Sequence, residues 1–135
     1  MTFNLRVLAP DQSVFDGSAD EVILPSTTGQ LGILTGHVSM ITALDSGVLR
    51  LREGNSWTTI ALSGGFAEVE ANEVTVLVNA AALGSSIDTA TAAKAFEAAQ
   101  QAFNALEGQP PSPEKLKAQQ ALATARARLS ASRGG

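Results

Sequence analysis

The chain has 135 residues, of which 44% are hydrophobic and 16% charged, with no cysteine and a formal net charge of −4. This length suits one main domain with a small appendage, and the composition is typical of a folded chain rather than a disordered one. The lack of cysteine excludes disulfides, thiolate metal ligands and thiol redox chemistry. There is no apolar run of the roughly 18 to 20 residues that a membrane span requires, and residues 1–10 do not resemble a signal peptide. We therefore expect a soluble protein that is not secreted.

The charge is distributed unevenly along the chain. Residues 1–84 hold three basic and nine acidic residues, whereas residues 85–135 hold six basic and four acidic ones. All charged residues after Glu114 are basic: Lys115, Lys117, Arg126, Arg128 and Arg133. This excess predicts an acidic partner surface, although the same residues could simply keep an alanine-rich helix in solution. We expect no nucleic-acid binding, because no aromatic residue lies beside these cations to stack on a base.

Residues 1–84 have the pattern of an antiparallel β structure. Short runs rich in β-branched and aliphatic residues alternate with glycine and polar turn residues, and in residues 48–52 apolar and basic side chains alternate. The runs predict strands at 3–9, 21–24, 30–35, 47–53, 57–63, 66–70 and 73–79. Tight turns are expected at 53–56 and 70–73, where asparagine or glycine tolerates a positive φ. Many short strands at this spacing predict a mainly β sandwich of two packed antiparallel sheets over residues 1–84.

Residues 85–135 have a helical pattern instead. Asp88 is a candidate N-cap and Gly108 a candidate terminator of a first helix, and Ser112 with Pro113 can begin a second one. The apolar residues recur at helical spacing in two stripes, which are Ala92, Phe96, Ala99, Phe103 and Leu106, then Ala118, Leu122, Ala125 and Leu129. The pattern predicts an antiparallel α-helical hairpin over residues 85–135. Because both stripes contain few large side chains, we expect the hairpin to need support and to exchange between a state folded on the sandwich and an extended one.

The residues needed for catalysis are largely missing. His37 is the only histidine, so a zinc site or a Ser-His-Asp triad lacks most of its components. The glycines near His37 and those at 64–65 match neither dinucleotide nor P-loop motifs, and are interpreted as turn residues. We therefore expect no enzyme activity, no catalytic residues and no metal. The alternatives are a free-standing β-sandwich module that binds peptides or proteins at a strand edge, and last, a small hydrolase with an unrecognised site.

One stretch resembles a known family. It runs from Glu21 to His37 as EVILPSTTGQLGILTGH and is followed by TAL at 42–44, GVLR at 47–50 and SGGF at 63–66. The order and spacing of these glycines and of Gly36-His37 resemble those in the epsilon subunit of rotary F-type ATP synthases. The sequence is most similar to cyanobacterial and chloroplast members. The resemblance covers the whole chain.

The resemblance implies a non-catalytic rotor subunit of the central stalk, which couples rotation of the c-subunit ring to the catalytic head during proton-driven ATP synthesis. The sandwich would bind the gamma subunit and the ring of c subunits. The residues implied to face them are Gly29, Gln30, Leu31, Gly32 and His37. The hairpin would extend toward the catalytic alpha and beta subunits and inhibit ATP hydrolysis, with Lys115, Lys117, Arg126, Arg128 and Arg133 as candidate contacts. The subunit would be peripheral on the cytoplasmic or stromal face of the thylakoid membrane, or on a bacterial inner membrane, and held there only through the complex.

Some bacterial members of the family bind ATP through an Ile/Leu-Asp-x-x-Arg-Ala motif. In this chain Ile87, Asp88 and Ala92 match it, but Thr91 stands in place of the arginine. Threonine lacks the forked donor with which a guanidinium binds phosphate. We therefore expect no cofactor, and weak or absent ATP binding.

Overall fold

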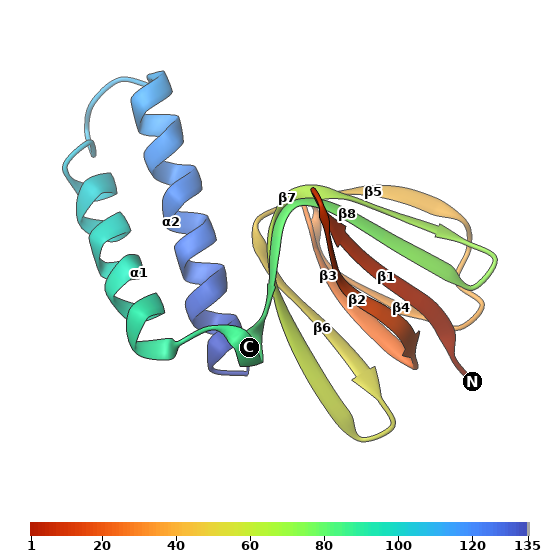
Figure 1. Cartoon of the computed structure of the whole chain (residues 1–135). Coiled ribbons are helices and arrows are strands. Elements are labelled where there is room, and N and C mark those ends of the chain that lie inside the picture. Colours follow the sequence, from red (N-terminus) through yellow and green to blue (C-terminus); the bar gives the residue numbers. More distant parts are fainter. Residues whose placement is uncertain (135) are drawn as a thin grey trace.

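The computed structural model describes residues 1–134 as eight strands followed by a helical hairpin (Figure 1). The strands are β1 (Phe3–Ala9), β2 (Gln12–Ala19), β3 (Glu21–Ser26), β4 (Gly29–Leu34), β5 (Met40–Leu44), β6 (Gly47–Glu53), β7 (Ser56–Glu70) and β8 (Glu73–Leu83). They are followed by a 3₁₀ turn, η1 (Gly84–Ser86), and the helices α1 (Thr89–Asn104) and α2 (Pro113–Ser132). The expected fold class, a β-sandwich followed by a helical hairpin, is confirmed. Gly135, the last residue of the expected hairpin unit, lies outside the described residues.

The strands form one connected sheet that folds over on itself rather than two separate sheets. Their order is β2-β1-β8-β7-β5-β3-β4, and β6 pairs with both β3 and β7. The pair β1–β8 is parallel, which differs from the expectation of purely antiparallel sheets. Parallel neighbours need a long crossover connection, and here the chain between β1 and β8 supplies it. The other strand pairs are antiparallel, as expected.

Strand β7 replaces two of the expected strands. It runs without interruption through Gly64 and Gly65; its first half pairs with β6 and its second half with β5, while β8 follows it along both. Gly65 has φ +152°, and a Cβ placed there would overlap the carbonyl oxygen of Leu77. Glycine is therefore required at position 65, where β7 changes from pairing with β6 to pairing with β5.

The core of the sandwich consists only of strand residues. Its most deeply buried side chains are Leu5, Val7, Val22, Leu24, Ile33, Leu49, Leu51, Ile60, Leu62, Val74 and Val76. No residue of α1 or α2 belongs to this cluster among the described residues. The sandwich thus has a core of its own, which does not depend on the helices.

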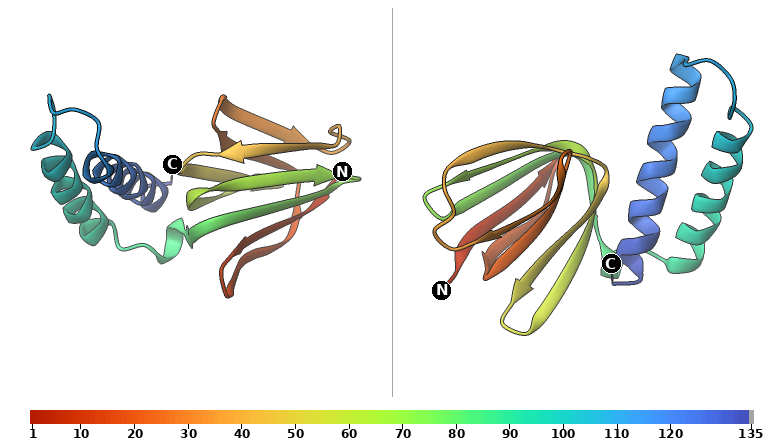
Figure 2. Two further views of the ribbon diagram at one scale, coloured as in Figure 1. Left: turned by 90° about the horizontal axis from the view of Figure 1, so that it is seen from above. Right: turned by 180° about the vertical axis from the view of Figure 1, so that it is seen from behind.

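The two helices begin at the expected caps. The Asp88 carboxylate accepts the N–H of Thr91, and the Ser112 hydroxyl accepts the N–H of Lys115, with Pro113 in the first turn. The helices pack against each other, and Leu122 and Ala125 of the second stripe are buried. The hairpin stands beside one end of the sandwich (Figure 2), and α2 contacts β6 and β7 there. The structure therefore has the hairpin in the state folded against the sandwich.

Candidate functional site

An exposed apolar row crosses the outer face of the sandwich. Ala43 of β5 pairs with Phe66 of β7, Phe66 pairs with Leu77 of β8, and Leu77 pairs with Leu8 of β1. Phe66 and Leu77 are 43% and 39% exposed, while their neighbours along the strands point into the core. We call these four residues the outer apolar row. A contiguous exposed apolar surface of this kind is typical of a protein interface.

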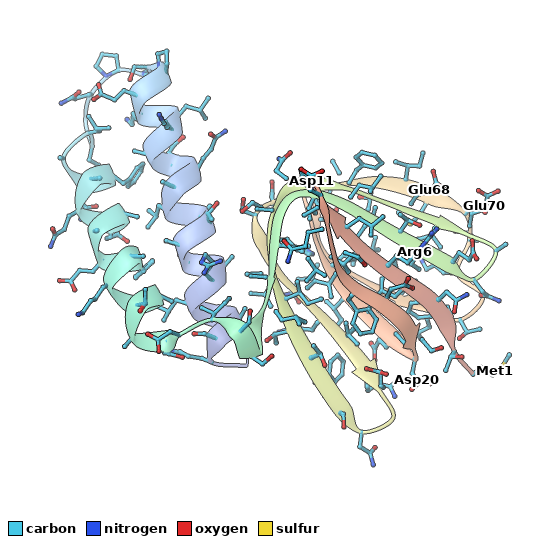
Figure 3. All side chains as sticks on the ribbon, viewed as in Figure 1. Met1, Arg6, Asp11, Asp20, Glu68 and Glu70 are labelled. Atoms are coloured by element: carbon cyan, nitrogen blue, oxygen red, sulfur yellow. The ribbon has the colours of Figure 1, made fainter. Side chains whose placement is uncertain are left out.

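Polar residues border the outer apolar row on one side. In the next register of the same strands, Arg6 pairs with Thr75 and Thr75 with Glu68. The Arg6 guanidinium donates to the Thr75 hydroxyl at 3.4 Å. Figure 3 shows Arg6, Glu68 and Glu70 in the part of the sandwich that lies away from the helices. An apolar centre with a charged border has the anatomy of a specific interface.

Sequence reasoning missed the outer apolar row. The alternation in β7 and β8 indicates that Phe66 and Leu77 lie opposite the buried positions, but not that they are neighbours. Their pairing depends on the register across the Ala71–Asn72 turn, where both residues have positive φ. Counting outward from that turn is the one sequence signal that could have found the pair.

His37 lies in the loop between β4 and β5, at the sandwich end opposite the hairpin. The loop is held by the N–H of Gly36, which donates to the side-chain oxygen of Asn72 at 2.8 Å. The His37 ring nitrogen Nδ1 lies 2.9 Å from the carbonyl oxygen of Val38. Three apolar side chains in or beside this loop are exposed: Leu34 at 55%, Val38 at 74% and Ile41 at 69%. The loop thus carries a second apolar surface, which adjoins the border of the outer apolar row because Ile41 pairs with Glu68.

The structure does not bring His37 together with all of the expected ring-facing residues. Gly29, Gln30, Leu31 and Gly32 lie in the first part of β4, and His37 follows the opposite end of that strand. Gln30 lines a cleft against α2, and its side-chain oxygen accepts a hydrogen bond from Arg50 at 3.3 Å. The five residues therefore form two groups, one at the start of β4 and one in the loop after its end.

The five cations after Glu114 are distributed over several sides of α2. Lys115 donates from Nζ to the carbonyl oxygen of Gln109 at 2.8 Å, which fastens the link between the helices. Lys117 and Arg128 line one groove, while Arg126 places its guanidinium 5.9 Å from the Phe96 ring centre on α1. Arg133 caps the helix and is exposed. Within residues 1–134 the only ion pair joins Arg52 and Glu21, so these cations have no carboxylate partner there.

The residues of the degenerate nucleotide motif lie at the junction of sandwich and hairpin. Ile87 and Ala92 are buried in a small cluster with Ala61, Ala127 and Ala131. Thr91 is already bound through its N–H and hydroxyl to the Asp88 carboxylate. The motif positions therefore serve capping and packing in this structure.

Among residues 1–134, no three histidine, cysteine or acidic residues gather as metal ligands would. Neither α1 nor α2 is long and apolar enough to cross a membrane.

Comparisons with known proteins identify the family. The model of the ATP synthase delta/epsilon chain β-sandwich domain matches residues 2–84, and that of the long α-helix domain matches residues 85–133. The chain belongs to the ATP synthase epsilon chain family. An epsilon chain of Synechococcus sp. strain CC9902 is 68% identical over 133 residues, covering 98% of both chains. One from Prochlorococcus marinus strain MIT 9303 is 62% identical and covers 98% of this chain and all of its own length.

Solved structures agree on the fold. A chain in the Euglena gracilis mitochondrial ATP synthase assembly of OSCP, F1 and c-ring has a TM-score of 0.79 at 24% identity, with 98% of this chain and 81% of that chain covered. A chain in the central stalk and c-ring of the Tetrahymena thermophila enzyme has a TM-score of 0.60 at 19% identity, with 95% and 94% covered. As an epsilon chain, this protein is a non-catalytic subunit of ATP synthase, peripheral to the membrane.

Proposed function

We propose that this epsilon chain is a rotor subunit, which couples rotation of the c-subunit ring to the catalytic head and restrains ATP hydrolysis through its hairpin. The family match over residues 2–133 supports a role in ATP synthase, and the fold is shared with chains from assemblies described as OSCP, F1 and c-ring and as central stalk and c-ring. The observation that carries the coupling role is the outer apolar row, because a rotor subunit needs a surface for a stable partner.

We assign the outer apolar row to the gamma subunit. Phe66 lies near its centre, and a partly exposed aromatic side chain is the usual anchor of a protein interface. The neighbouring Arg6 and Glu68 would then form the border that fixes orientation. Gamma would thus cover β5, β7, β8 and β1 together.

The test of this assignment is the affinity of purified gamma for three full-length chains. Phe66→Gln should weaken binding at least tenfold, because it removes the aromatic anchor. Trp57→Gln is the matched control, since Trp57 is also exposed, at 49%, but lies at the β6–β7 turn. Equal affinity of the Phe66→Gln and unchanged chains would contradict the assignment.

The c-ring is assigned to the loop that holds His37 and, as a second contact further along β4, to Gly29 to Gly32. Leu34, Val38 and Ile41 give this loop an exposed apolar surface, and the bond from Gly36 to Asn72 holds it in place. Val38→Gln should reduce proton-driven ATP synthesis in the reconstituted complex without changing the affinity for gamma. Normal synthesis in that variant would count against the loop as a ring contact.

The hairpin is assigned to the catalytic head when it is extended. The five basic residues after Glu114 have no carboxylate partners among residues 1–134, so they remain available to acidic side chains of alpha and beta subunits. The complex would hold the chain at the cytoplasmic or stromal face of the thylakoid membrane or at a bacterial inner membrane. Replacement of Arg126 and Arg128 by glutamine should raise ATP hydrolysis by the complex; an unchanged rate would remove these two residues from the inhibitory contact.

A further inference from the structure

The last turn of α2 is bound directly to the sandwich. The Thr59 hydroxyl of β7 donates to the carbonyl oxygen of Ala131 at 2.8 Å, and Ala131 is 1% exposed. The last four carbonyl groups of a helix lack partners within the helix, so an outside donor is needed when such a group is buried. The N–H of Gly134 also reaches this oxygen, at 3.1 Å. Thr59 thus supplies the donor that comes from outside the helix.

Gly84 makes this approach possible. It is buried in η1, and a Cβ placed on it would overlap both the Ala131 carbonyl oxygen and the Thr59 hydroxyl oxygen. Its backbone is not in the left-handed region, so any residue could adopt its conformation. What Gly84 contributes is therefore space for the end of α2, and not an unusual φ.

Clefts interrupt the rest of the contact between α2 and the sandwich. A cleft of about 300 Å³ separates residues 123–130 of α2 from the strands around Gly47 and Arg50, and one of about 430 Å³ lies between Leu116 and Asp45. In the described chain, one further side-chain hydrogen bond joins α2 to the sandwich, between the hydroxyls of Ser63 and Thr124 at 3.3 Å. Beside the first cleft, Ala127 and Ala131 are buried in a small cluster with Ala61 of β7, so the close contact is limited to this edge and to the end of the helix.

We propose that Thr59, Gly84 and Ala131 form a latch that holds the hairpin on the sandwich. A partly buried hydrogen bond and a close-packed glycine keep the end of α2 in place. Their loss frees the hairpin, whose helices then open more often because they lack support, while the sandwich stays folded. The sandwich retains its structure because its core contains no helix residue. The latch concerns docking alone, so it can be tested in the isolated full-length chain whether or not the hairpin inhibits hydrolysis.

Hydrogen exchange of the full-length chain tests the latch. Gly84→Ala should accelerate exchange of the α1 and α2 amides at least tenfold, because the added methyl group cannot fit while α2 is docked. Strand amides should not change. Ser85→Ala is the matched control, since Ser85 is the next residue of the same turn and is exposed. Unchanged helix amides in Gly84→Ala, or equal acceleration in the strands, would overturn the proposal.

Thr59→Val tests the same latch without adding an atom that clashes. It keeps the shape of the side chain and removes the donor, which corresponds to about fivefold faster exchange in the helices. If Gly84→Ala does not fold, helix exchange in Thr59→Val alone tests whether the latch holds the hairpin. Helix exchange equal to that of the unchanged chain would show that the hydrogen bond does not hold the hairpin.

Discussion

Asp88 accepts two hydrogen bonds from Thr91, one from its hydroxyl at 2.6 Å and one from its backbone N–H at 2.9 Å. Thr91 stands at the position where the Ile/Leu-Asp-x-x-Arg-Ala motif has arginine. Here its side chain is hydrogen-bonded at the start of α1, and the pair caps this helix, which follows η1. The same two residues therefore define how the hairpin begins and how it could respond to pH and to nucleotide.

The first prediction concerns pH. Two hydrogen bonds from Thr91 lower the pKa of Asp88 from its ordinary value of 3.8, and the bond from the hydroxyl contributes more than the bond from the N–H. A carboxyl group whose pKa is lowered by folding stabilises the folded state above its unfolded pKa and loses this effect as the pH falls through the folded value. The melting temperature of Asp88→Ala should therefore lie below that of the unchanged chain at pH 7, and the difference should shrink below about pH 4. A difference that does not depend on pH would contradict this role of the carboxylate.

The second prediction concerns nucleotide. Without a guanidinium at position 91, the motif lacks a bidentate phosphate donor. A calorimetric titration of the full-length chain with ATP should show weak or absent binding. A micromolar dissociation constant would mean that other residues, such as Arg126 or Arg128, supply the missing donor.

The third prediction compares two glycines. Gly65→Ala should destabilise the chain by about 2 kcal/mol or more, because the residue has φ +152° and its new Cβ would overlap Leu77. Gly32→Ala should change stability by less than about 0.5 kcal/mol, since no atom lies within 4 Å of the added carbon. Urea unfolding of both variants measures the difference. Equal stability of the two would mean that β7 can cross between the layers without glycine at 65.

The local pattern predicted much of the fold. The strands β1 and β6 begin and end as expected, and the helix caps at Asp88 and Ser112 are where the sequence placed them. These features depend on alternation, on turn chemistry and on residues close in sequence, all of which a single chain displays.

Other features depend on contacts between distant segments. Strand β2 was missed because it pairs only with β1 and carries the polar residues of an exposed edge; β5 was missed because it is short and half exposed. The parallel pair β1–β8 joins the first and last strands of the sandwich, which are far apart in the sequence. No local sequence pattern predicts such a pairing. The outer apolar row and the contact of Ala131 with Gly84 also depend on register and packing between separate elements.

The fourth prediction compares two leucines of α2. Leu122 is 7% exposed, whereas Leu116 is 54% exposed. Leu122→Ala should cost about 2 kcal/mol, seen as roughly 30-fold faster exchange of the hairpin amides. Leu116→Ala should leave exchange nearly unchanged. Similar effects of the two substitutions would indicate that the stripes do not hold the hairpin together.

The most direct test of the rotor account is ATP hydrolysis by the complex assembled with the full-length chain and with a chain that lacks residues 85–135. The sandwich has a core of its own and carries the outer apolar row, so the shortened chain should still bind gamma. The account predicts normal capture of gamma together with faster ATP hydrolysis. An unchanged hydrolysis rate in a complex that assembles normally, or loss of gamma binding by the shortened chain, would contradict it.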